Sequence, residues 1–293
     1  MESLETVKNQ LNTAKELHSV VKTMKALAAV SIRQFQEAVK SLKDYNQAVN
    51  LGFQALISTR PMMPVNQEFQ TGKRAGIILF GSDHGMCGQF NEIIISFFQH
   101  KLEELDLTHD EIELITVGKK VTDRCRGLGM KINSVFSVPG SAPAITYKTQ
   151  LVMPHIEEWY SLQDVNTIFL VHNQYRQGAS FKPELNRLLP LDETWFKKLE
   201  KKRWPTNMIP LYTINWNKMF TGLLKHYLFA SLYTAFADSL ASEHASRLAS
   251  MQEAEKNIKE RVENLTDKYH QQRHINITNE LLDIVSGYEA LTQ

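Results

Sequence analysis

The distribution of proline constrains this chain more than any other feature of its sequence. All nine prolines lie between Pro61 and Pro210, so residues 1–60 and 211–293 contain no residue that must break a helix. We therefore predict a long helix at each end, the first ended by Pro61 and Pro64, and a separate folded segment between them. An unbroken helix over most of the second flank would be about 110 Å long. No compact domain can bury such a helix, so we expect it to project and to meet partners.

Composition narrows the class of protein. Thirty-three basic and thirty-two acidic residues give no electrostatic reason to expect a nucleic acid or an anionic membrane as partner. The sequence shows no signal peptide and no apolar stretch long enough to span a bilayer, so a membrane link is expected only through another subunit. Cys87 and Cys125 form no CxxC pair, which favours a reducing compartment and argues against structural zinc. We expect no cofactor and no metal.

Both flanks carry the apolar spacing of a coiled coil. In the first, steps of three and four residues trace a seam that His18, Lys25 and Asn46 interrupt. Its other positions are Leu4, Val7, Leu11, Ala14, Val21, Ala28, Ile32, Phe35, Val39, Leu42 and Val49. In the second flank, the recurring positions are Leu248, Met251, Ile258, Val262, Leu265 and Tyr269. A folded insert returns the chain near its start, which favours antiparallel pairing within one chain. A parallel homodimer is the alternative. The second flank is the longer one, so its end should protrude as a single helix.

In the insert, the apolar residues follow a different spacing from that of the two flanks. Residues 75–80 form a continuous apolar run typical of a buried parallel strand, followed by a glycine-rich turn and the amphipathic run 90–105. The unit recurs, with further strands expected at 113–117, 131–138 and 165–171 and helices at 119–128 and 145–160. We predict an open, doubly wound, Rossmann-like sheet of about five strands, with a possible hairpin in 177–210. The predicted parts are therefore a helix over 1–60, an α/β domain over 73–200 and a helix over 211–293.

The turn from Gly81 to Gly88 is the obvious place for chemistry, because ligands of open α/β sheets bind where a strand leads into a helix. Asp83, His84 and Cys87 have the residue types of a nucleophile and its base. However, the glycine spacing is neither that of a dinucleotide fingerprint nor that of a phosphate loop. The competing interpretation is a structural turn in which Gly81, Gly85 and Gly88 permit backbone conformations or close approaches that a side chain would hinder, and Cys87 is a small buried hydrophobe.

Two further candidates lie in the second flank. In the run 240–251, Glu243 and Arg247 stand four residues apart, which in an isolated helix means an ordinary surface ion pair. Near the chain end, Arg273, Thr278 and Glu280 accompany a set of apolar residues whose exposure would be costly. That set comprises Ile275, Ile277, Leu281, Leu282, Ile284 and Val285. We therefore expect another protein to surround this end.

Four segments together resemble the gamma subunit of F-type ATP synthases. They are the runs 24–29, 82–88, 240–251 and 277–287, so the resemblance spans both ends and the insert. It implies a long antiparallel coiled coil that forms the rotor shaft inside a ring of alpha and beta subunits. It also implies that the α/β insert packs at the foot, with the epsilon subunit and the membrane c-ring as neighbours there.

The resemblance assigns contacts with the catalytic ring to five residues. Arg273, Thr278 and Glu280 match positions that meet the beta-subunit loops, and Met24 and Lys25 match the N-terminal segment that faces the same ring. The chain departs from the family at three places: His84 usually is Arg, His274 usually is Gln, and residues 30–34 usually are more basic. This divergence is similar to that of the alternate, sodium-linked ATPase of some prokaryotes.

The function implied is that of a non-catalytic rotor subunit. It would couple rotation driven by proton or sodium flow to ATP synthesis or hydrolysis, in a peripheral complex on the cytoplasmic face of a prokaryotic inner membrane. Two rivals remain: an α/β nucleotide-using enzyme dimerised by its terminal helices, and a passive coiled-coil tether. Nucleotide affinity of the isolated chain would favour the first rival, and a stable homodimer without an ATPase partner would favour the second.

Overall fold

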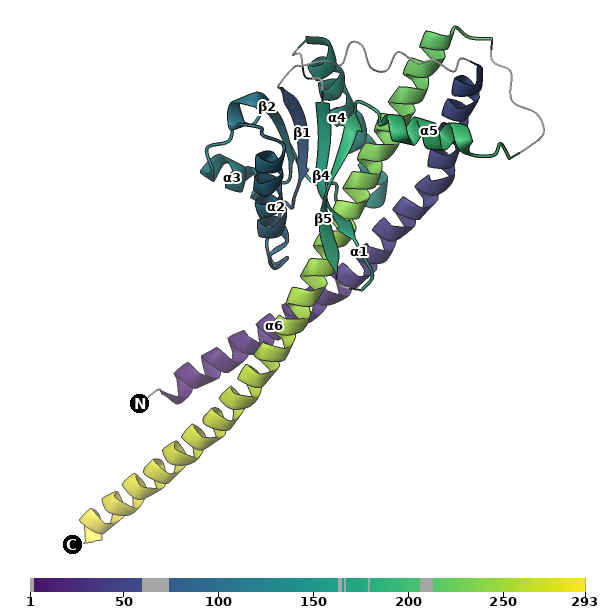
Figure 1. Ribbon diagram of the computed structural model, residues 1–293. Coiled ribbons are helices and arrows are strands. Elements are labelled where there is room, and N and C mark those ends of the chain that lie inside the picture. Colours follow the sequence, from purple (N-terminus) through teal and green to yellow (C-terminus); the bar gives the residue numbers. More distant parts are fainter. Residues whose placement is uncertain are drawn as a thin grey trace. The chain divides into compact units, whose positions relative to one another are not determined.

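The computed structural model describes residues 3–59, 74–162, 165, 167–178, 180–205 and 213–292 of the 293-residue chain. Pro61 and Pro64, predicted to end the first helix, lie outside these residues. The elements, labelled in Figure 1, are α1 (Leu4–Thr59), β1 (Ala75–Phe80), α2 (Phe90–Glu104), η1 (His109–Glu111), β2 (Ile112–Val117), α3 (Lys119–Gly127), β3 (Ser134–Phe136), α4 (Ala142–Leu162), β4 (Thr167–Tyr175), β5 (Phe181–Leu189), α5 (Glu193–Lys201) and α6 (Trp216–Thr292).

The chain divides into two compact units, and both terminal helices contribute to each. The first unit combines Met1–Ala28 with Arg247–Gln293, and the second is Ala29–Ser246. The helices α1 and α6 have 56 and 77 residues, so the prediction of one long helix at each end is confirmed. No helix in the described part of the chain combines the length and the apolar character needed to cross a membrane.

In each unit the two helices pair antiparallel. In the first unit, Leu11 and Ala14 share a buried cluster with Leu265, whereas Lys25, further along α1, pairs with Glu255, which precedes Leu265 in α6. In the second unit, the Phe35 ring stacks on His244 with 5.6 Å between centroids. The Phe53 ring, later in α1, lies 6.0 Å from the ring of Phe220, which is earlier in α6. Every predicted seam position of α1 is buried or half-buried, so the chain's own α6 occupies the seam.

The second unit is built on a five-stranded sheet of order β3-β2-β1-β4-β5. Strands β1 to β4 are parallel, and β5 runs antiparallel to β4 at one edge. The hairpin considered within residues 177–210 is not found among the described residues of that segment: it contributes one strand, β5, which pairs with β4 outside it, and then the helix α5. Pro183 is tolerated within β5 because an edge strand has one side without a ladder. The third strand is shorter than the predicted 131–138, since β3 is the other edge and its residues are only half-buried or exposed.

Each face of the sheet has its own core. Helices α2 and α3 cover one face, as Figure 1 shows, and their apolar residues meet alternate positions of the strands, among them Ile77, Leu79 and Leu114. Helices α4 and α6 and the second part of α1 cover the other face, where Ile78, Phe80 and Leu170 point. Both sides of the central strands are thus buried, which explains their continuous apolar runs.

Candidate functional site

The turn between β1 and α2 is tied together by its own polar side chains. Ser82, which is fully buried, donates from its hydroxyl to the carbonyl of His84 (2.9 Å) and accepts from the Asn91 side-chain amide (2.8 Å). The Asn91 carbonyl oxygen in turn accepts the Ser82 backbone N–H (3.0 Å). Because Asn91 lies in the first turn of α2, these bonds fix the end of the strand against the start of the helix.

Asp83 connects this turn to two neighbouring loops. One carboxylate oxygen accepts the backbone N–H of Lys119 at the start of α3, and the other accepts that of Val138 after β3, both at 2.9 Å. A carboxylate with two backbone donors is well satisfied. Asp83 therefore acts as a brace across the carboxyl ends of the parallel strands.

The contacts of Cys87 are those of a packed thiol. Its side chain is 2% exposed, and its sulfur lies 3.7 Å from the Ser82 hydroxyl and 3.7 Å from the backbone carbonyl of His84. The His84 side chain is exposed to solvent, and it is the carbonyl of this residue that approaches the thiol. The structural interpretation of the turn accounts for each of these contacts.

The glycines of the turn behave as expected at two of three positions. A Cβ on Gly81 would lie 2.5 Å from that of Val121, so α3 can approach only a glycine there. Gly88 has a positive φ of 55°. Gly85 has no positive φ, and a Cβ added to it would meet no heavy atom of the described residues within 4 Å, so its expected role is not observed. The left-handed residue beside it is Met86, with φ of 59°.

Helix α6 is attached to the sheet through two serines one turn apart. The Ser246 hydroxyl donates to the Cys87 carbonyl (2.6 Å), and the Ser242 hydroxyl lies 2.9 Å from the Asn173 carbonyl in β4. Glu243, between them, is only 5% exposed, so its expected place on an exposed helix face is wrong. The small residues of 240–246 bring this face of α6 against the sheet, and the Glu243 side chain is buried with it.

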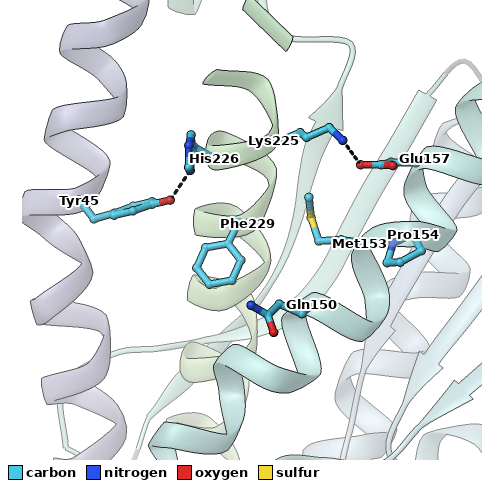
Figure 2. A pocket seen from close by; sticks show the side chains of 8 residues that line it. All are labelled: Tyr45, Gln150, Met153, Pro154, Glu157, Lys225, His226 and Phe229. Atoms are coloured by element: carbon cyan, nitrogen blue, oxygen red, sulfur yellow. Dashed lines mark hydrogen bonds and ion pairs between the residues drawn. The ribbon is translucent and has the colours of Figure 1, made fainter. Parts of the chain in front are cut away.

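A shallow hollow of about 440 Å³ lies among α1, α4 and α6 (Figure 2). Tyr45 and the Nδ1 of His226 form a 2.7 Å hydrogen bond across it, and Lys225 forms a 2.9 Å ion pair with Glu157. Its remaining lining is Gln150, Met153, Pro154 and Phe229. The polar groups drawn in Figure 2 thus largely satisfy one another. The described residues contain no group of three or more His, Cys, Asp or Glu side chains placed to hold a metal.

The five predicted ring contacts all lie in the first unit but differ in surroundings. Met24 and Lys25 are half-buried in α1, where the Lys25 ammonium hydrogen-bonds the Glu255 carboxylate of α6. This bond holds the pKa of Glu255 below its ordinary value. Arg273, Thr278 and Glu280 are exposed on α6, and the Thr278 hydroxyl donates to the His274 carbonyl of its own helix at 2.9 Å. The structure does not bring the two groups of residues together.

The end of α6 is open to solvent within its unit. Every residue from 277 to 288 is exposed. Six large apolar side chains in this stretch are between 42% and 70% exposed: Ile277, Leu281, Leu282, Ile284, Val285 and Tyr288. The predicted protrusion of a single helix is therefore confirmed within the first unit, and it presents a continuous apolar surface.

The sequence did not point to several residues that stabilise this architecture. Glu255 could have been found, because it fills the seam position between Met251 and Ile258 and mirrors the polar interruption at Lys25. Ser242 and Ser246 carried no such signal, since their bonds go to backbone groups distant in sequence, and Asn91 carried none because its partner, Ser82, lies in an irregular turn nine residues earlier.

Comparisons with known proteins agree over the whole chain. A family model described as ATP synthase matches residues 3–291. The ATP synthase gamma chain of Anaeromyxobacter sp. (strain Fw109-5) is 27% identical over 304 residues, covering 99% of this chain and 100% of the relative. The ATP synthase gamma chain of Pelotomaculum thermopropionicum is 28% identical over 297 residues, with the same coverage.

Solved structures share the fold. A chain in the cryo-EM structure of Euglena gracilis mitochondrial ATP synthase, OSCP/F1/c-ring, rotational state 3, superposes with a TM-score of 0.66 at 19% identity, over 98% of this chain and 94% of that one. A chain in the rotor structure of the same organism's enzyme, rotational state 1, gives a TM-score of 0.63 at 18% identity, over 94% and 98%.

Proposed function

Since this chain belongs to the ATP synthase family, we propose that it is a gamma-type, non-catalytic central-stalk subunit of an F-type ATP synthase. Full-length similarity to gamma chains and to chains of rotor structures supports this function. The observation that carries the mechanism is the end of α6, a single helix that is exposed on all sides and carries large apolar residues along one of them. Such a segment requires a surrounding partner, which the alpha and beta subunits of a catalytic ring would provide.

The proposed mechanism is mechanical. An asymmetric shaft presents different side chains to catalytic subunits that are otherwise equivalent, so each angular position favours a different nucleotide-binding state through differential contacts. Arg273, Thr278 and Glu280 would supply polar contacts on α6. Met24 would contact the ring from α1, whereas Lys25 would reach the ring only while also paired with Glu255. Hydrogen bonds to charged groups contribute about 1.5 to 3 kcal/mol each, enough to bias positions without fixing the shaft.

We also infer that the α/β domain meets the epsilon subunit and the membrane c-ring. Rotation driven by proton or sodium flow would then be coupled to ATP synthesis or hydrolysis. The subunit would belong to a peripheral complex on the cytoplasmic face of a prokaryotic inner membrane. The departures at His84 and His274 favour the alternate, sodium-linked type of this ATPase.

The test is a reconstitution with the alpha and beta subunits of the source organism. We expect the full-length chain to enter the complex and to support ATP turnover, and we expect Arg273→Ala with Glu280→Ala to lower that turnover without lowering assembly. The matched control is Arg126→Ala with Glu103→Ala, which removes the same charges from exposed positions of the α/β domain. A chain that does not enter the ring contradicts the proposed function. Parental turnover by the Arg273/Glu280 variant contradicts only the contact set.

A further inference from the structure

A polar cavity of about 330 Å³ lies within the second unit, where α6 passes over β4 and β5. Its polar lining comes from Asn46 of α1, His172 and Gln174 of β4, Asn186 and Arg187 of β5, and Tyr227, Ser231, Thr234 and Asp238 of α6. At about 30 Å³ for each water, the cavity has room for several water molecules. Polar groups therefore face one another here, on the face of the sheet that otherwise carries the larger apolar core.

Two groups on the β4 wall have no hydrogen-bond partner in the described protein. They are the Nδ1 of His172 and the side-chain oxygen of Gln174. His172 is only 3% exposed, and burial lowers its pKa to about 4. The imidazole is therefore neutral at neutral pH, and this wall supplies hydrogen-bonding capacity but no positive charge to balance a carboxylate.

Asp238 faces this wall from α6, and charged groups of both signs lie near its carboxyl. Arg176, the residue after β4, approaches it, but the Arg176 guanidinium is already paired with Glu184 of β5 at 3.0 Å. The other charged or titratable groups around the cavity are Arg187, which pairs with Asp192 at 4.0 Å, and the phenol of Tyr227. Burial chiefly, and Glu184 next, raise the pKa of Asp238 to about 7, against the opposing effect of Arg176.

The backbone of Asp238 belongs to the turn that attaches α6 to the sheet. The Ser242 hydroxyl lies 2.7 Å from the Asp238 carbonyl and 2.9 Å from the Asn173 carbonyl, so its single proton is shared between the helix and β4. A displacement of this turn of α6 would lengthen the bond to β4. A charge that draws water to Asp238 therefore acts directly on the attachment.

We propose that the Asp238 carboxyl is a proton-binding site whose ionisation loosens the attachment of α6 to strand β4. The ligand is the proton itself, and water in the cavity supplies the route for its exchange. With the proton bound, a neutral carboxylic acid faces a neutral imidazole, and both can hydrogen-bond the cavity water. Without it, a negative charge is added beside Glu184 in a site whose nearest arginine is already paired.

The sign of the effect follows from linkage. A carboxyl with a raised pKa binds its proton more tightly in the closed state than in an opened, hydrated one, where the pKa is about 4. The closed state is therefore favoured at low pH, and its advantage is lost as pH rises from about 4 through about 7. Between pH 6 and pH 8, the equilibrium constant for local opening should rise about tenfold.

Hydrogen exchange of the full-length chain, read by mass spectrometry and corrected for the intrinsic pH dependence of amide exchange, tests this. In the wild-type chain we expect peptides covering 230–246 to lose about tenfold in protection between pH 6 and pH 8. Asp238→Asn, which imitates the protonated side chain, should remove this dependence. Asp44→Asn, at an exposed position of α1 in the same unit, should retain it.

A second variant, Glu184→Gln, tests the proposal independently in case Asp238→Asn does not fold. Glu184→Gln removes the neighbouring negative charge, so the midpoint of the pH dependence should move to lower pH. The proposal is overturned if the wild-type peptides show no pH dependence in this range, or if a folded Asp238→Asn chain keeps it. An unshifted midpoint in Glu184→Gln also contradicts it.

Discussion

Ser246 in α6 donates a 2.6 Å hydrogen bond to the carbonyl of Cys87, a residue 159 positions earlier in the turn after β1. The serine is 8% exposed and the cysteine 2%, so water cannot readily replace either partner. The bond therefore joins the C-terminal helix to the turn that the sequence marked as the candidate for chemistry. It gives that turn a structural purpose.

Ser246→Ala should destabilise the second unit by about 0.5 to 1.5 kcal/mol, because it removes one of the two donors to the buried Cys87 carbonyl, which also accepts the Phe90 backbone N–H at 3.2 Å. Urea unfolding monitored by circular dichroism measures the change. Ser286→Ala is the matched control, since it makes the same substitution at an exposed position of the same helix and should change stability by less than about 0.5 kcal/mol. Equal effects of the two substitutions would mean that the bond to Cys87 contributes nothing.

Gly118→Ala should cost about 2 kcal/mol or more of stability. Gly118 has φ of +109°, and an added Cβ would lie 2.8 Å from the backbone of Gly81 and Ser82. Gly127→Ala provides the comparison, because none of the described residues comes within 4 Å of its Cβ position and its φ is not positive. At Gly127, alanine should be neutral or stabilising by up to about 1 kcal/mol. In thermal unfolding, Gly118→Ala should therefore lower the midpoint temperature and Gly127→Ala should leave it unchanged or raise it.

His172 should make stability depend on pH in the direction opposite to Asp238. Burial lowers its pKa from 6.5 to about 4, so the folded chain resists a proton that the unfolded chain accepts. Its contribution is complete above pH 6.5 and is lost as pH falls towards 4. His172→Gln should remove this acid-side loss in urea titrations between about pH 4 and pH 7. His84→Gln makes the same substitution at an exposed position and is the matched control.

Lys25→Gln should raise the pKa of the Glu255 carboxyl towards its ordinary value, because the Lys25 hydrogen bond is the main cause that lowers it. The contribution of this pair is present above the ordinary glutamate pKa and is lost as pH falls through the lowered one. Carboxyl-carbon NMR titration measures the midpoint. The control is Lys8→Gln, at an exposed position of the same helix, which should leave the midpoint of Glu255 unchanged. An unchanged midpoint in Lys25→Gln would mean that the pair does not form in solution.

The sequence predicted those parts of the fold that follow from local period and punctuation. Alternate steps of three and four residues from Leu4 identified positions of α1 that are all buried or half-buried. This succeeded because a coiled-coil seam needs apolar residues at the same two positions of every heptad. The run Ala75–Phe80 identified a central strand because both faces of that strand are buried. The hairpin partner β5 and the short helix α5 were less clear, since an edge strand alternates weakly and contains Pro183.

The resemblance to gamma subunits is confirmed by relatives that align over the full chain, yet the five assigned contact residues stay a prediction. Individual polar contacts were harder to predict than the fold for a physical reason. The bonds of Ser242, Ser246 and Asp83 end on backbone groups, which leave no complementary residue type in the sequence to search for. Burial of Glu243 was missed because i,i+4 spacing describes a helix alone and not what packs against it.

The spacing of Ser242 and Ser246 also fixes the angular phase of α6. The two hydroxyls stand four residues apart, on one line of the helix, and reach acceptors in a strand and a loop, Asn173 and Cys87. Advancing the helix by one residue would turn this line by about 100° and carry both hydroxyls away from their acceptors at once. The α/β domain and this stretch of α6 must therefore turn together, so that a torque applied to the domain enters the helix without slip.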